Sequence, residues 1–122
     1  MERPDNNPKS IFGMKKPALG LIPSPALIHT AIAFQLGAAK YGPYNWREKS
    51  VSAMVYLNAA ERHLRAFLDR EDVEEESGAC HLGHVMACCA IILDAMAVNN
   101  LIDDRPIYAP VGDILKQFTK ED

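Results

Sequence analysis

The sequence predicts an all-α domain, and two observations predict it. In three segments the hydrophobic residues recur with the period of a helix, and no segment shows the alternation that is typical of a strand. Residues that start or stop helices bound these segments. With 122 residues, of which 48% are hydrophobic and 24% charged, the chain has the length and composition of one globular domain and not of a disordered chain.

An extended arm is expected over residues 1–23, where prolines and glycines recur and disfavour regular structure. The first helix then begins at Ser24, which can cap it, with Pro25 at a position where proline already has a helical backbone. It ends within residues 37–41, and residues 44–49 form a loop. Three apolar residues near the end of the arm are expected to pack on the body of the domain: Leu19, Leu21 and Ile22.

Two longer helices are expected to pair as a hairpin, joined by an acidic turn. The first covers about 50–69, with Ser50 or Ser52 as its cap, and the second covers about 77–98. Residues 101–122 form a tail with one short helix. The apolar residues of that short helix are Val111, Ile114, Leu115 and Phe118.

The helix over residues 77–98 is apolar on all of its sides, and such a helix is buried on all sides. The body of the domain, residues 24–100, has only three expected helices and cannot surround it. We therefore expect an all-α helical-hairpin bundle that is completed by a homo-oligomer, either a dimer or a tetramer.

The net charge and the length of the apolar runs argue against several classes of partner. A net charge of −3 argues against a nonspecific nucleic-acid binder. The longest apolar run, around residues 85–98, is interrupted by Asp94 and is too short to span a membrane. The N-terminus is polar, and the three cysteines are typical of reduced thiols. We expect a soluble cytoplasmic protein with neither nucleic acid nor membrane as a partner.

Two polar residues lie on the apolar face of the helix over residues 50–69. Glu61 falls near the middle of its stripe of leucines, and His63 lies at the edge of the same arc. A carboxylate in such a place is costly unless a cation or several donors meet it. A salt bridge to an arginine and a metal site both satisfy this requirement.

His81 and His84 lie one turn apart at the start of the next helix, directly after five carboxylates. A structural explanation is available for both groups. The histidines could be satisfied core residues, and the acids could form a solvated loop that complements the dipole of the following helix. Both groups also have a functional explanation, because oxygen ligands on a loop beside imidazoles suit Mg²⁺ or Mn²⁺. The carboxylates are those of Glu71, Asp72, Glu74, Glu75 and Glu76.

Several sequence blocks in a fixed order carry a family resemblance. They begin with Lys-Pro-Ala-Leu at 16–19 and Lys-Tyr-Gly-Pro-Tyr-Asn-Trp-Arg at 40–47, and continue with Arg-His-Leu at 62–64, Glu-Ser-Gly at 76–78 and His-Leu-Gly-His at 81–84. In these blocks, which span most of the chain, the sequence resembles the dATP/dGTP diphosphohydrolases of phages and bacteria. These are the MazZ-like proteins, relatives of the MazG-like all-α NTP pyrophosphatases. The ExxE…ExxD carboxylate motif of the wider MazG group is not plainly present.

The resemblance implies a reaction and its cofactors. A purine deoxynucleoside triphosphate, dGTP and also dATP, would be cut between the α- and β-phosphates to the monophosphate and pyrophosphate. Two or more Mg²⁺ or Mn²⁺ ions would serve the reaction. In phages with modified DNA, the dGMP would supply 2-aminoadenine nucleotides.

The resemblance also implies site residues, and residues 24–100 would be the catalytic domain. The expected metal ligands are Glu61, Glu71, Glu74 and Glu76, with His81 as a further ligand or as a residue that orients one. The expected catalytic residues are His63, His84 and Glu76. The residues expected to hold phosphates are Lys16, Lys40 and Arg62, and those expected to recognise the nucleoside are Asn45 and Trp46.

Two other functions are compatible with the residues alone. The histidines with Asp72 would suit an HD-type phosphohydrolase, although no adjacent His-Asp pair occurs in the sequence. A non-catalytic helical module that binds nucleotides would carry the same acidic loop.

Overall fold

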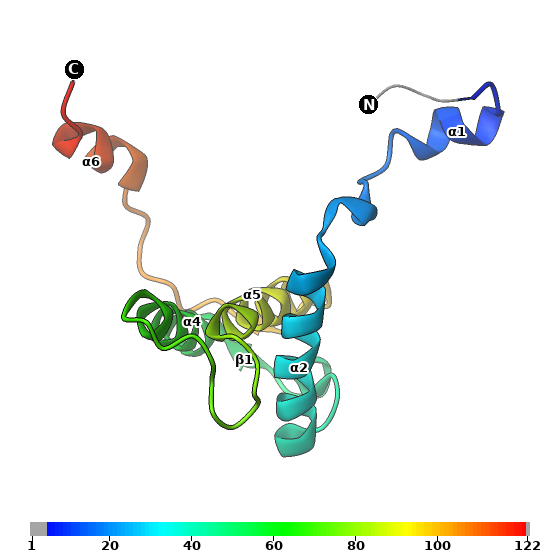
Figure 1. Ribbon diagram of the computed structural model, residues 1–122. Helices are drawn as coiled ribbons and strands as arrows, with labels where there is room; N and C mark the ends of the chain where they lie inside the picture. The colour runs from blue at the N-terminus through cyan, green and yellow to red at the C-terminus, as the bar shows by residue number, and fades with distance from the viewer. Residues whose placement is uncertain (1–4, 122) are drawn as a thin grey trace.

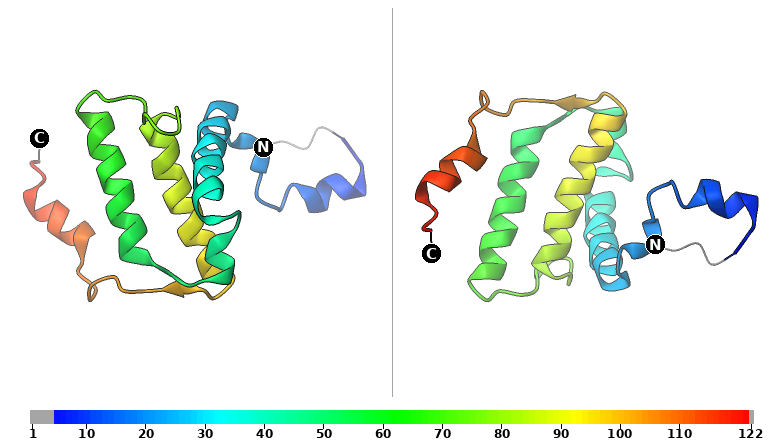
Figure 2. Two further views of the ribbon diagram at one scale, coloured as in Figure 1. Left: turned by 90° about the horizontal axis from the view of Figure 1, so that it is seen from below. Right: turned by 90° about the horizontal axis from the view of Figure 1, so that it is seen from above.

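The computed structural model describes residues 5–121 and confirms the all-α class. Three helices form the body: α2 (Ser24–Tyr41), α4 (Ala53–Leu68) and α5 (His81–Ala97). Helix α5 lies between the other two and packs on both, with α4 antiparallel to it (Figures 1 and 2). Among the described residues, no helix combines the length and the apolar content needed to cross a membrane.

Local signals place the ends of α2 and α4 close to the predicted positions. Ser52 caps α4, because its hydroxyl accepts the backbone N–H of Val55 at 3.4 Å. Ser24 is the first residue of α2 and makes no capping bond, so the predicted serine cap is wrong there. Gly42 ends α2 with a φ of 89°, a conformation that glycine adopts without a steric penalty.

Helix α5 begins at His81, three residues later than Gly78, where the sequence suggested a start. The intervening residues close a turn on themselves instead. The backbone N–H of Glu74 donates to the carbonyl of Ala79, and that of His81 donates to the carbonyl of Asp72. Gly78 has a φ of 77°, which permits this reversal. The turn therefore has a fixed shape and holds its acidic side chains beside the start of α5.

Several small elements were not expected from the sequence. Strand β1 (Val51–Ser52) pairs in parallel with strand β2 (Leu101–Ile102) and ties the end of the body back to the start of α4. Residues 44–49, predicted as a loop, contain the one-turn helix α3 (Asn45–Glu48).

The segments at both ends of the chain project away from the body (Figure 1). The first was predicted to be extended over residues 1–23, but it carries the helix α1 (Pro8–Gly13), which Asn7 caps, and the 3₁₀ turn η1 (Leu19–Leu21). The second carries α6 (Val111–Phe118). The short helix expected in the tail is therefore confirmed. The expected packing of the arm is wrong, because Leu19, Leu21 and Ile22 are 76%, 74% and 51% exposed.

The core of a single chain is thin. The buried hydrophobic residues of the described chain are five alanines, one cysteine and one tryptophan, and no large side chain is fully buried. The accessible surface is 9875 Å². A compact monomer of 13.5 kDa exposes about 6,500 Å². The chain thus exposes roughly half as much again as a compact monomer of its mass, including apolar residues on α4, α5 and α6.

Gly83 sets the distance between α5 and α2. A Cβ atom at this position would lie 2.6 Å from the carbonyl oxygen of His29. Gly83→Ala is therefore expected to lower the free energy of unfolding by about 1–3 kcal/mol, because the helices must move apart. Gly37→Ala is the matched control, since a Cβ at Gly37 in α2 meets nothing within 4 Å. Urea unfolding checks both, and equal stability of the two variants would contradict this packing.

Candidate active site

Two adjoining cavities lie beside the start of α5. The large cavity has a volume of about 650 Å³ and lies among α2, α3, α4 and α5. The acidic cavity, of about 450 Å³, is lined by Arg62, His63, Ala66, Glu71, Glu74, Glu75 and His81. His63 and Glu74 line both cavities, so the two form one continuous candidate site.

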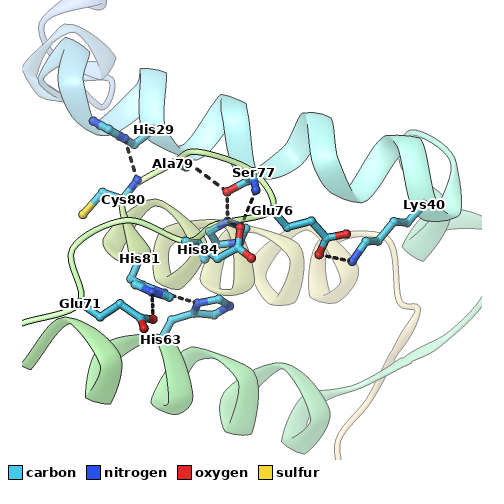
Figure 3. Close-up of polar contacts among 11 residues, drawn as sticks. His29, Lys40, His63, Glu71, Glu76, Ser77, Ala79, Cys80, His81 and His84 are labelled. Atoms are coloured by element: carbon cyan, nitrogen blue, oxygen red, sulfur yellow. Dashed lines mark hydrogen bonds and ion pairs between the residues drawn. The ribbon is translucent and has the colours of Figure 1, made fainter. Parts of the chain in front are cut away.

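A chain of hydrogen bonds links the acidic turn to α4. Nε2 of His81 lies 2.6 Å from Oε2 of Glu71, and Nδ1 of His81 lies 2.8 Å from Nδ1 of His63 (Figure 3). A carboxylate only accepts hydrogen bonds, so Nε2 of His81 carries the proton. When His81 is neutral, its Nδ1 accepts the Nδ1 proton of His63. Nε2 of His63 is then unprotonated and can take a proton.

His84 forms the other side of this cluster. Its ring stacks on that of His63, with centroids 4.6 Å apart. Nε2 of His84 lies 2.7 Å from the hydroxyl of Ser77, and the backbone N–H of Ser77 donates to Oε2 of Glu74 at 2.6 Å. The turn thus fixes the orientation of both the imidazole and the carboxylate.

Lys40 enters the large cavity from the C-terminal end of α2. Its Nζ lies 2.9 Å from Oε1 of Glu76, and both side chains are partly exposed (Figure 3). A lysine beside the cavity that is held by one solvent-exposed carboxylate can exchange that partner for a phosphate oxygen, because surface ion pairs contribute little stability.

The opposite part of the large cavity is aromatic. Phe34, Tyr41, Trp46 and Tyr56 line it together with several alanines and glycines. Trp46 falls within residues 44–49, which were predicted as a loop, but it is helical and buried. It belongs to α3, is 7% exposed and packs against Phe34 with ring centroids 5.7 Å apart. An apolar, aromatic chamber of this kind suits the flat face of a purine.

The structure brings most of the predicted site residues together. Those that line one or both cavities are Lys40, Asn45, Trp46, Arg62, His63, Glu71, Glu74, Glu76, His81 and His84. Two predicted residues line neither cavity. Glu61 is exposed on α4, so the prediction that it is buried in a core stripe is wrong. Lys16 is exposed in the N-terminal arm. Both residues therefore lie apart from the cluster.

Asp94 was missed as a site residue, although it lines the large cavity. Its carboxylate accepts hydrogen bonds from the indole N–H of Trp46 at 2.6 Å and from the guanidinium of Arg47. The signal was present in the sequence, because Asp94 is a single carboxylate inside an apolar helix. Glu75, which lines the acidic cavity, was part of the acidic turn but was not chosen as a ligand.

Burial keeps two of the imidazoles neutral. Burial, followed by the neighbouring His84 and His81, lowers the pKa of His63 below its ordinary value of 6.5, and burial lowers the pKa of His84 as well. Both rings are therefore free to accept protons near neutral pH. The pKa of the Cys88 thiol, raised by burial to about 11, makes this cavity residue an unreactive thiol.

These lowered pKa values predict that stability falls in mild acid. Below pH 6.5 the unfolded chain binds protons on these histidines that the folded chain does not, so the free energy of unfolding decreases until the lowered pKa is passed. The melting temperature is expected to fall between about pH 7.5 and about pH 5.5, and to fall less in the double variant His63→Gln, His84→Gln. Thermal melts followed by circular dichroism check this, and an equal fall in the double variant would contradict it.

The side chains of the acidic cavity fit Mg²⁺ or Mn²⁺ only if the phosphates of a bound nucleotide supply some of the metal ligands. Among residues 5–121, no three His, Cys, Asp or Glu side chains are arranged to hold one ion. On nucleotides, however, Mg²⁺ needs only one or two carboxylates, since the phosphates provide further oxygens. Glu71, Glu74 and Glu75 line the acidic cavity and could serve in this way. Both ring nitrogens of His81 already have partners, which favours an orienting role for it.

A comparison with known families gives a match over most of the chain. Residues 6–105, well over half of the chain, match the family described as dATP/dGTP diphosphohydrolase, N-terminal. No curated protein and no solved structure matches the chain. The matched segment includes both cavities and all three body helices.

Proposed function

Since the chain belongs to the dATP/dGTP diphosphohydrolase family, we propose that it hydrolyses dGTP, and also dATP, between the α- and β-phosphates. The products are the deoxynucleoside monophosphate and pyrophosphate. The family membership makes the chain an enzyme that acts on purine deoxynucleoside triphosphates. This membership excludes the alternative function of a non-catalytic module that binds nucleotides.

The observation that carries the proposal is the joining of a polar cavity to an aromatic one. The large cavity, at about 650 Å³, has the size of a small-molecule site, for which the usual range is about 300–1,000 Å³. The triphosphate lies at the end with Lys40, His63 and the acidic turn. The purine enters the aromatic part, beside Trp46 and Asn45.

His63 is the general base in this proposal. A water molecule attacks the α-phosphorus, the new P–O bond forms, and the bond from the α-phosphorus to the α,β-bridging oxygen breaks. Nε2 of His63 takes the proton of the water, and pyrophosphate leaves with the bridging oxygen. Glu71 and His81 act on the reaction through His63, whose tautomer they fix.

The remaining polar residues hold the substrate. Lys40 and Arg62 bind phosphate oxygens, and His84 stacks on His63 and keeps it in place. Mg²⁺ or Mn²⁺ would be held by carboxylates of the acidic cavity, Glu71, Glu74 and Glu75, together with the phosphates, and when bound would neutralise the charge of the triphosphate and favour deprotonation of the attacking water. The carboxylate of Glu74 is suited to this. Burial raises its pKa, but hydrogen bonds from Ser77 and Glu76 together with the neighbouring His84 lower the pKa below its ordinary value.

The active form is a homo-oligomer. The surface in excess of a compact monomer supports this, because obligate interfaces bury about 2,000–5,000 Å² and are rich in apolar residues. Exposed apolar side chains that a second copy would cover include Val55, Leu64 and Leu68 on α4, and Leu93 and Met96 on α5. In a phage with modified DNA, the dGMP product would supply the synthesis of 2-aminoadenine nucleotides.

Product analysis tests the proposed reaction. The protein is incubated with each of the four common dNTPs and four NTPs in the presence of Mg²⁺ or Mn²⁺, and the products are separated by ion-exchange chromatography. We expect dGMP and pyrophosphate from dGTP, with slower turnover of dATP. Deoxyguanosine with triphosphate, or dGDP with phosphate, would overturn the proposal.

A further inference from the structure

Asp94 is a carboxylate at one end of the large cavity. It lies on α5 ten residues after His84, and both residues line the cavity. Ten residues of α-helix span about 15 Å. An extended nucleoside triphosphate has a comparable length, so a substrate with its phosphates beside His84 places its base near Asp94.

The carboxylate of Asp94 has a fixed orientation. Oδ2 accepts from Nε1 of Trp46 at 2.6 Å and from Nε of Arg47 at 2.8 Å, and Oδ1 accepts from Nη2 of Arg47 at 2.9 Å. Arg47 also lies over the ring of Tyr44, 4.5 Å from its centroid. These contacts hold the carboxylate in one plane, and they lower the pKa of Asp94 to about 2. The group is ionised at any physiological pH.

One acceptor position of this carboxylate remains open. Each carboxylate oxygen can accept about two hydrogen bonds. Oδ2 accepts two, whereas Oδ1 accepts one. The side chain of Asp94 is 29% exposed and lines the cavity, so Oδ1 can receive one more donor.

We propose that Oδ1 of Asp94 accepts a hydrogen bond from the Watson–Crick edge of guanine and thereby selects dGTP over dATP. Guanine presents two adjacent donors on this edge, the N1–H and the 2-amino group. Adenine carries no 2-amino group, and the lone pair of its unprotonated N1 faces a carboxylate unfavourably. The one donor of adenine on this edge is the 6-amino group, which lies where guanine has the acceptor O6. The inference rests on the proposed function, because it requires the purine to occupy the aromatic chamber.

A purely structural role for Asp94 makes a different prediction. Asp94 would then only anchor Trp46 and Arg47. Substitution of Asp94 or of Arg47 would in that case change kcat/KM for both purines by the same factor. Arg47→Gln is the matched control, because it removes two of the three hydrogen bonds to Asp94 but leaves the carboxylate.

The experiment measures kcat/KM for dGTP and for dATP in the wild type, Asp94→Asn and Arg47→Gln, with helical content checked by circular dichroism. We expect the wild type to prefer dGTP, and the dGTP:dATP ratio to fall about tenfold or more in Asp94→Asn, because the charged acceptor is lost and the new amide can donate to N1 of adenine. The ratio in Arg47→Gln is expected to stay within about twofold of the wild type.

Three results would overturn the inference. One is a wild type whose kcat/KM for dATP equals that for dGTP. This measurement requires no variant, so it tests the inference even if Asp94→Asn fails to fold. Another is an unchanged ratio in a folded Asp94→Asn, and the third is an equal fall in ratio in Arg47→Gln. A wild type that is inactive on both purines would instead refute the proposed function.

Discussion

His63→Gln is expected to lower kcat for dGTP hydrolysis by about 100- to 10,000-fold, which is the usual contribution of a general base. His63 lines both cavities and has an unprotonated Nε2 when its Nδ1 donates to His81. Glutamine keeps a polar side chain of similar length but cannot take a proton near neutral pH. We expect KM to change much less than kcat, because the substrate contacts of Lys40 and Arg62 remain. Steady-state kinetics with dGTP measures both parameters.

The orienting residues are expected to show smaller losses. Glu71→Gln keeps an acceptor for Nε2 of His81, so it lowers kcat less than His63→Gln does, and His81→Ala falls between them. His29→Gln is the control, because His29 lines neither cavity and its contact is with the backbone N–H of Cys80. Nearly normal turnover by folded His63→Gln, or equal losses in His63→Gln and His29→Gln, would remove His63 from the role of base.

Leu64→Glu is expected to dissociate the oligomer and to lower the melting temperature by about 10 °C or more. In one chain Leu64 is 50% exposed, where a charge would cost little. In an interface the same carboxylate would be buried without a partner, at a cost of several kcal/mol. Light scattering coupled to size-exclusion chromatography measures the mass, and thermal melts measure the stability.

Asn58→Glu is the matched control for this substitution. Asn58 is an exposed polar residue on the same helix, and the change alters the charge by the same amount. It is expected to leave the mass and the melting temperature unchanged. If the wild type is a monomer, or if both variants retain the wild-type mass, the leucine face of α4 is not an interface.

The fold was predictable wherever its signals are local. The serine cap at Ser52 and the glycine at Gly42 act within one turn of the chain, and the helices end near them. Features that depend on distant residues were not predictable. The pairing of β1 with β2 joins segments about fifty residues apart, and the late start of α5 depends on the closed turn from Asp72 to His81.

The site was predictable in its residue types but not in its geometry. The periodicity placed Glu61 with the leucines of α4, but Leu64 and Leu68 are 50% and 63% exposed, and Glu61 is exposed with them. His63, at the edge of that stripe, faces α5 instead. The sequence shows Asp94 as a single carboxylate inside an apolar helix, but only the folded chain places that carboxylate beside Trp46. A rotation of one helix about its axis decides which polar residue reaches the site, and a single sequence does not fix that rotation.

The most direct test of the account is a crystal structure with Mn²⁺ and a dGTP analogue that has a non-hydrolysable α,β-bridge. The account predicts the purine in the aromatic chamber beside Trp46, and the α-phosphate within reach of Nε2 of His63. A nucleotide bound elsewhere, or one with its base beside the acidic turn and its phosphates beside Asp94, would contradict it.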